Sequence, residues 1–206
     1  MNSALKYLGR IGKELIALDQ TRIRFVRIQL SSDVPEGLTL FTPFVLNDWI
    51  PADPFDPARP ELVEAESISP LPLKRSSRKI KHTLAKMTAP EDLPPLWLAG
   101  PSVKYSTMTG DSPSVALLHI GRQLALVSEH RNHELQLGFP WRGGFHSFPF
   151  AEEYADLHLP DGVEKVAGRR KLKPYFNLNP GSLLIAFSAP EDGYCRKLVV
   201  KVLPKL

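Results

Sequence analysis

The sequence has one cysteine, Cys195, and no long apolar run. A lone thiol cannot form an intramolecular disulfide, so a disulfide-stabilised extracellular domain is excluded. No apolar segment approaches the roughly 20 residues that cross a bilayer, and the N-terminus lacks the pattern of a secretory signal. We therefore expect a cytoplasmic protein with no membrane contact.

Familiar catalytic and cofactor motifs are also missing. The sequence contains no GxxxxGK[ST] phosphate loop, no GxGxxG, no HExxH, no CxxC and no GxSxG. Their absence excludes those families only, because many catalytic sites are assembled from residues scattered along a chain. We expect no cofactor and no metal, and the sequence favours a non-enzymatic role.

The composition is that of a folded protein. Of the 206 residues 43% are hydrophobic and 23% are charged, values near the averages for soluble globular domains. The net charge of +4 is basic but modest, and the charges are grouped. Residues 1–30 are mainly basic, whereas residues 33–66 are mainly acidic. The length suits one substantial domain with appendages.

The first half of the chain predicts a helix, then strands, then an extended arm. Leu5, Leu8 and Leu15 belong to an apolar set with helical spacing over residues 3–18. Alternation predicts a strand over 21–30 with a β-bulge near Phe25, and a second strand over 38–46. Residues 51–72 combine six prolines with acidic side chains, which predicts an irregular connector. Such a segment is either a linker or an arm that lies on another surface, such as a partner.

A basic amphipathic helix is expected over residues 73–87. Leu73, Ile80, Leu84 and Met87 fall on one side of it and the cations on the other. A second basic string follows at 169–173. Both could meet phosphates, although a charged helix face is often simply solvated. The predicted nucleic-acid-binding residues are Lys74, Arg75, Arg78, Lys79, Lys81, Arg142, Arg169, Arg170, Lys171 and Lys173.

The second half reads as antiparallel β-structure. Segments 115–120 and 123–128 flank Gly121-Arg122, which predicts a tight hairpin, and 133–138 could add a strand. Segments 182–188 and 194–202 flank a turn with Pro190 and Gly193, a second hairpin whose last strand would have one wet face carrying Lys197.

The expected fold is therefore α+β and β-dominated: an antiparallel sandwich or barrel-like sheet with an N-terminal helix and a basic amphipathic helix. Residues 1–50 would form the N-terminal helix and the strands joining the core. Residues 51–94 would form the acidic proline-rich arm and the basic helix, and residues 95–206 an antiparallel β domain.

An aromatic string over residues 139–150 has two interpretations. Its aromatics surround Gly143-Gly144 and lie beside Arg142. They could grip a partner or stack on bases, or they could fold inward and plug one end of the β-structure, the commoner fate of large apolar groups. The predicted partner-binding residues are Phe139, Trp141, Phe145 and Phe148.

A histidine-rich patch carries the main enzymatic alternative. His130, His133, His146 and Glu134 could converge on a metal or form a dispersed hydrolase or nuclease site. A polar loop between two strands accounts for the same residues. Cys195 could likewise be a nucleophile or a half-buried strand thiol.

Three hypotheses for function remain open. The leading one is a non-catalytic subunit of a larger cytosolic assembly, with other protein subunits and RNA or DNA as partners. The second is a small hydrolase or nuclease around the histidine patch. The third is a structural protein of a virion or a secretion machine.

Overall fold

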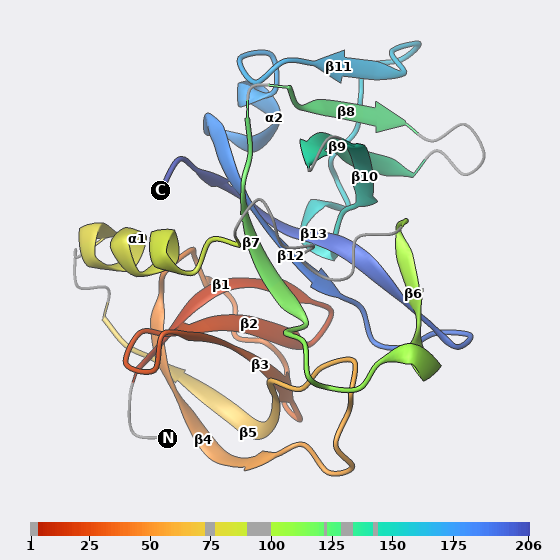
Figure 1. Ribbon diagram of the computed structural model, residues 1–206. Coiled ribbons are helices and arrows are strands. Elements are labelled where there is room, and N and C mark those ends of the chain that lie inside the picture. The colour runs from red at the N-terminus through yellow and green to blue at the C-terminus, as the bar shows by residue number, and fades with distance from the viewer. Residues whose placement is uncertain (1–3, 73–76, 90–99, 122, 129–133, 142–143) are drawn as a thin grey trace. The chain divides into compact units, whose positions relative to one another are not determined.

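The structure is a computed structural model that describes residues 4–72, 77–89, 100–121, 123–128, 134–141 and 144–206. Strands dominate it, as the sequence predicted (Figure 1). The chain divides into two compact units. Unit 1 contains Met1–Met87 with Met108–Ser114, and unit 2 contains Thr88–Thr107 with Val115–Leu206.

Unit 1 is a closed five-stranded barrel with one helix (Figure 1). Its elements are β1 (Leu5–Ile11), β2 (Glu14–Asp19), β3 (Arg24–Leu30), β4 (Pro43–Pro51), β5 (Leu62–Pro70) and α1 (Ser77–Lys86). The strand order around the barrel is β1-β2-β3-β5-β4. All neighbouring strands are antiparallel except β3 and β5, which are parallel.

The barrel interior is a continuous apolar core. Alternate residues of each strand point inward, as the period-two geometry of a strand requires. The buried members of this core are Leu5, Tyr7, Leu15, Ala17, Val26, Ile28, Leu30, Phe44, Val63, Ala65 and Ile68. Val34, Leu38, Leu46 and Trp49 pack against it.

The predicted N-terminal helix is wrong, because residues 5–19 form a β-hairpin. Gly12 has φ +57° and occupies the first position of a two-residue turn, where a type II′ hairpin needs glycine. A register shift between Tyr7 and Gly9 changes the phase of β1. With that shift and with both faces of the hairpin partly buried, the apolar residues recur at intervals that mimic helical spacing.

The predicted bulge near Phe25 is also absent. β2 and β3 pair without interruption from Glu14↔Gln29 to Asp19↔Arg24. Ile23, which suggested the change of phase, precedes the strand and has φ +52°. The irregularity in the sequence therefore marks the turn before β3.

The expected irregular arm over residues 51–72 is wrong for Leu62–Pro70, which form β5. This strand pairs with β3 on one side and β4 on the other, so it closes the barrel. Prolines lie outside β5 at positions 60 and 72 and at its last residue, Pro70, so none interrupts the middle of its ladder. The segment is built into unit 1 and is no longer a candidate arm.

Unit 2 contains two four-stranded antiparallel sheets. Its strands are β6 (Ser102–Lys104), β7 (Val115–His119), β8 (Ala125–Ser128), β9 (Leu135–Trp141), β10 (Gly144–Pro149), β11 (Lys165–Ala167), β12 (Pro180–Phe187) and β13 (Tyr194–Pro204). Short helices lie at η1 (Tyr105–Thr107), η2 (Glu152–Tyr154) and α2 (Lys173–Phe176). The sheet orders are β10-β9-β8-β11 and β6-β13-β12-β7.

Of the two hairpins predicted in this half, one is confirmed. β12 and β13 pair as expected, with Asp192 and Gly193 both at positive φ in the turn. The hairpin across Gly121 is wrong, because β7 pairs with β12 and β8 pairs with β9 and β11. Each of these strands is short and apolar, and local spacing does not reveal which sheet a strand joins.

Candidate nucleic-acid interface

Helix α1 presents one apolar side and one cationic side, as predicted. Ile80 is 6% exposed and Leu84 is 0% exposed, whereas Arg78, Lys79, His82 and Lys86 are exposed. At 100° per residue the four exposed side chains lie within about a third of the helix circumference, away from Ile80 and Leu84. The helix contains no acidic residue.

Three predicted phosphate-binding residues of this region lie in α1. Arg78 and Lys79 are exposed and Lys81 is partly exposed. Among the described residues these three form no ion pair. Lys74 and Arg75, together with Leu73 of the predicted apolar face, lie outside the described residues.

The second basic element is a turn that leads into α2, and we refer to residues 168–173 as the basic turn. Gly168 has φ +103°, and its N–H donates to the Leu124 carbonyl at 2.7 Å. The N–H groups of Lys171 and Leu172 donate back to the Gly168 carbonyl at 2.9 and 3.2 Å. Leu172 is 0% exposed, so the turn is anchored both by hydrogen bonds and by an apolar side chain.

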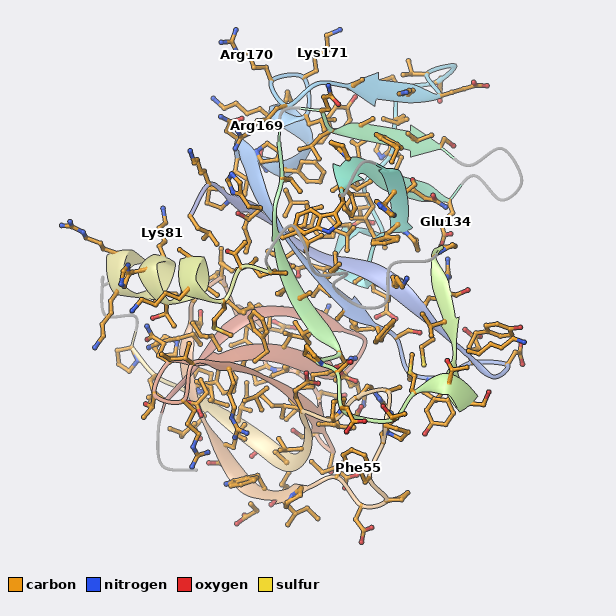
Figure 2. All side chains as sticks on the ribbon, in the orientation of Figure 1. Phe55, Lys81, Glu134, Arg169, Arg170 and Lys171 are labelled. Atoms are coloured by element: carbon orange, nitrogen blue, oxygen red, sulfur yellow. The ribbon has the colours of Figure 1, made fainter. Side chains whose placement is uncertain are left out.

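The cations of the basic turn divide into two kinds. Arg170, Lys171 and Lys173 are exposed, and Figure 2 shows the side chains of Arg170 and Lys171 extending away from the ribbon. Arg169 instead donates from Nε to the Pro180 carbonyl. Its Nη2 lies 2.6 Å from the position that a Cβ on residue 181 would take, so Gly181 makes room for it. Arg169 therefore holds the turn in place and leaves three cations facing solvent.

The aromatic string is mostly interior. Phe139, Trp141 and Phe148 are buried, and the rings of Phe139 and Phe148 meet edge to face at 5.5 Å. The inward plug therefore describes these three residues. Phe145 is 59% exposed, and its ring lies against Gly138. Arg142 lies outside the described residues.

The two described members of the histidine patch, His146 and Glu134, have different partners. His146 has Nε2 3.2 Å from the Trp141 carbonyl and packs beside the Phe139 ring. Glu134 accepts two hydrogen bonds from Arg196 Nη2, each of 2.7 Å. His130 and His133 lie outside the described residues. In the part of the chain that the structure describes, no three His, Cys, Asp or Glu side chains are grouped so that they could hold a metal.

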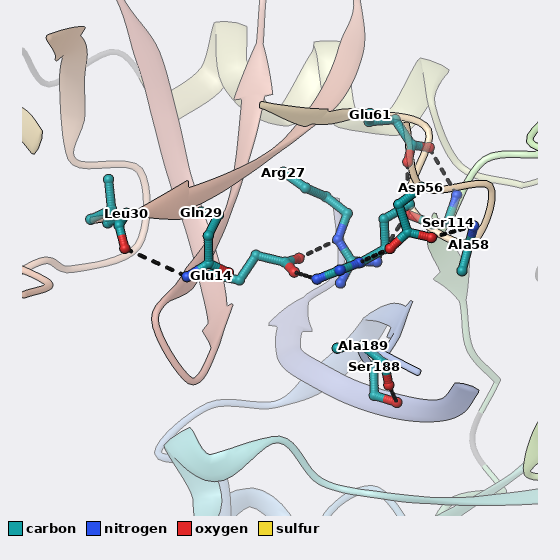
Figure 3. Close-up of polar contacts among 11 residues, drawn as sticks. Glu14, Arg27, Gln29, Leu30, Asp56, Ala58, Glu61, Ser114, Ser188 and Ala189 are labelled. Carbon is teal, nitrogen blue, oxygen red and sulfur yellow. Dashed lines mark hydrogen bonds and ion pairs between the residues drawn. The ribbon is translucent and has the colours of Figure 1, made fainter. Parts of the chain in front are cut away.

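Sequence reasoning missed a buried charge network in unit 1 (Figure 3). Arg27 is 0% exposed; its Nε donates to Glu14 and its Nη1 donates to Ser114 Oγ at 2.9 Å. Ser114 Oγ in turn donates to Glu61 Oε2 at 2.6 Å. Glu14 also accepts a hydrogen bond from Arg59 Nη1 at 2.9 Å, so Arg59 belongs to the same network.

Arg59 joins this network to a further carboxylate, that of Asp56. Its Nε donates to Asp56 Oδ2 at 2.6 Å. Burial lowers the pKa of Arg59, but hydrogen bonds and charge from Asp56 and Glu14 outweigh burial and raise it above its usual value. Asp56, which the sequence assigned to the arm, thus pairs with Arg59 inside unit 1. In sequence, the signal was an arginine between Val26 and Ile28 at the centre of a strand.

Lys197 was also missed as a buried group. The wet face predicted for the last strand is wrong at this position, because Lys197 is 0% exposed. Its Nζ donates to the Gly100 carbonyl at 2.8 Å and lies 5.8 Å from the centre of the Phe148 ring. Burial lowers the pKa of Lys197 to about 8. Cys195, two residues earlier, is buried and is not part of a disulfide.

Comparison with known proteins gives no relative from which a role could be transferred. No family model, no curated protein and no solved structure matches the chain. Among the described residues no helix has the length and apolar character needed to cross a membrane. The physical properties of the two basic elements are therefore the basis for a functional proposal.

Proposed function

We propose that the protein is a non-catalytic subunit of a larger assembly and that it contacts nucleic acid through α1 and the basic turn. The observation that carries this proposal is the arrangement of α1. Ile80 and Leu84 are buried while Arg78, Lys79 and Lys86 face solvent on a helix without any acidic residue. Phosphate groups are the natural counterparts of such a face.

The charge pattern of α1 favours a ligand over a simple solvated face. Solvated helices commonly alternate charges of both signs, and pairs of like charges four residues apart destabilise a helix. In α1 Arg78 and Lys81 are neighbours one turn apart, and the helix has no acidic residue. This repulsion is relieved when phosphates neutralise the cations.

The basic turn supports the same function from unit 2. Arg170, Lys171 and Lys173 project from a turn that is fixed by Gly168, Leu172 and the bond from Arg169. A rigid turn loses little conformational entropy when its cations meet phosphates. Both units therefore carry a cationic element on a fixed backbone.

The barrel topology is consistent with this class of function but does not locate the site. Its closed Greek-key order with a parallel β3–β5 pair is that of OB-type barrels, many of which bind oligonucleotides on strands 2 and 3. Likeness of fold alone does not imply function. Here Ile16, Leu18 and Arg27 on β2 and β3 are each 0% exposed, so α1 is the better candidate within unit 1.

The protein-contacting part of the proposal depends on Phe145. Of the four aromatics predicted to bind a partner, this residue is the exposed one. Exposed aromatic side chains are enriched in protein interfaces. We propose other protein subunits as partners at this position.

The proposed function is tested by reversing the charge of α1. The triple variant R78E/K79E/K86E should bind a mixed-sequence 20-nucleotide oligonucleotide at least about tenfold more weakly than wild type at 50 mM salt, in fluorescence anisotropy. A matched control, K13E/K104E/K165E, reverses three exposed lysines outside both basic elements and should bind like wild type. Equal loss of affinity in both variants would show that only net charge matters. Circular dichroism would check that both remain folded.

A further inference from the structure

The two basic elements hold cations but offer few rings on which a base could stack. Proteins that bind single strands combine a cationic groove with exposed aromatic side chains that stack on successive bases. In α1 the one ring among the exposed residues is the imidazole of His82. Beside the basic turn the corresponding ring is Tyr175, which is half-buried.

Most aromatic side chains of unit 2 are committed to its interior. Phe139, Trp141 and Phe148 are buried beneath the sheet of β9 and β10. A second group contains Phe150, Tyr154 and Phe176, whose ring centres lie 4.9 to 6.0 Å apart. Burial raises the pKa of Tyr154, and its hydroxyl accepts a hydrogen bond from the Val202 N–H at 2.9 Å. These rings therefore pack mainly against one another within unit 2.

In the part of the chain that the structure describes, the other well-exposed aromatic rings are those of Phe55, Phe145 and Tyr194. The Phe145 ring lies against Gly138, and the Phe55 ring lies against Gly110 in the same way. Tyr194 is in the β12–β13 hairpin next to Arg196, whose guanidinium is paired with Glu134. None of the three lies on α1 or in the basic turn.

The spacing of the cations on α1 suits the regularly spaced phosphates of a double helix. Arg78 and Lys86 are separated by eight residues, which is about 12 Å along a helix axis. Each strand of a double helix carries one phosphate per roughly 3.4 Å of its axis, so a row of this length can meet about three phosphates without bending the ligand. A flexible single strand would have to be ordered along the row without stacking to compensate.

Resting on the proposed function, we infer that the nucleic acid recognised is double-helical and that it is held through its phosphates. DNA and RNA duplexes share this chemistry. Contacts of this kind position a protein on a duplex and carry little sequence information. Binding should therefore be largely independent of base sequence.

The experiment compares four ligands of equal length with the full chain: a 20-base-pair DNA duplex, the same duplex in RNA, and the two single strands. At 50 mM salt at least one duplex should bind about tenfold or more tightly than its single strand, in anisotropy titrations. Shuffling the duplex sequence should change the affinity by less than about threefold. The DNA and RNA arms identify which duplex is preferred.

Two further variants separate the contribution of phosphate contacts from that of base stacking. H82A/Y175A removes the two rings nearest the cations, and it should change duplex affinity by less than about threefold. R170E/K171E/K173E should weaken duplex binding at least about tenfold. Single strands that bind as tightly as duplexes, with affinity lost in H82A/Y175A, would overturn the duplex inference and leave the proposed function standing. Failure of all four ligands to bind at 50 mM salt would overturn the proposed function itself.

Discussion

Arg27 and Lys197 are two cations that the fold places entirely inside, and their surroundings differ. Arg27 meets the Glu14 carboxylate and the Ser114 hydroxyl. Lys197 donates to the Gly100 carbonyl and lies over the Phe148 ring. Burial lowers the pKa of Lys197, whereas removing Arg27 would leave the buried Glu14 carboxylate with less compensation. The two cations therefore give different predictions.

Replacing Arg27 with methionine should lower the free energy of unfolding by about 3–5 kcal/mol, because Glu14 would keep a buried charge with less compensation. Urea denaturation measures the change. K13M is a suitable control, since Lys13 pairs with Asp33 on the surface and should cost no more than about 1 kcal/mol. A loss below about 1 kcal/mol for R27M would contradict the buried network.

The lowered pKa of Lys197 predicts a distinct pH dependence of stability. Below pH 8 the lysine is protonated in both folded and unfolded chains, so its burial penalty is present in full. Between pH 8 and the ordinary lysine value of 10.5 only the unfolded chain keeps the proton, and stability rises with pH. The rise is at most about 1.4 kcal/mol per pH unit.

K197M isolates this contribution from those of other titrating groups. The free energy of unfolding of wild type relative to K197M should increase from pH 8 to pH 10 in urea titrations. Parallel curves for the two proteins over that range would show that Lys197 has its ordinary pKa and keeps its proton in the folded state.

At the scale of elements, the sequence predicted secondary structure correctly where the apolar residues followed a single periodicity. The apolar side of α1 was predictable because a single buried stripe produces helical spacing. The β1–β2 hairpin was not, since burial on both faces and a register shift near Leu8 imitate that spacing. Strand β5 was missed because flanking prolines and acidic residues suggested a solvated connector.

Helix α1 gives an element-scale prediction. Leu84 is fully buried, so L84A should destabilise the protein by about 2–5 kcal/mol through lost apolar burial and the cavity that remains. R78A, on the exposed side, should change stability by less than about 0.5 kcal/mol. Thermal or urea unfolding distinguishes them. A similar cost for both would show that the helix does not pack as described.

The position of β5 in the barrel predicts resistance to proteolysis. Cleavage needs locally unfolded backbone, and β5 is paired with β4 from Val63 to Pro70 and with β3 from Leu62 to Ala65. Limited proteolysis of the isolated chain, followed by mass spectrometry, should give first cuts elsewhere. Early cleavage within Leu62–Pro70 would restore the interpretation of this segment as an arm.

For the candidate interface, the sequence indicated which residues are cationic but not how each is used. In the sequence, nothing distinguishes the roles of the consecutive basic residues Arg169, Arg170 and Lys171. In the folded chain Arg169 is drawn back to the Pro180 carbonyl because Gly181 leaves room for it, while its two neighbours remain exposed. Burial of the aromatic string depends likewise on the pairing of β9 with β10, a contact that spacing alone does not determine.

On the scale of the whole molecule, the chain passes from unit 1 to unit 2 at residue 88, returns for residues 108–114 and then leaves again. Ser114 at the end of the returning segment is bonded to Arg27 and Glu61. A return of this kind has no signature in composition or periodicity. The sequence therefore suggested one domain with appendages where the structure has two compact units.

The central claim is that both units present cations to the phosphates of nucleic acid, and the salt dependence of binding tests it most directly. Each element offers about three cations, so a plot of log affinity against log salt should have a slope of about −3 for one element engaged and about −5 for both. Reversing the charges of α1 or of the basic turn should flatten the slope, and the K13E/K104E/K165E control should not. A slope near zero, or one that both reversals leave unchanged, would contradict the account.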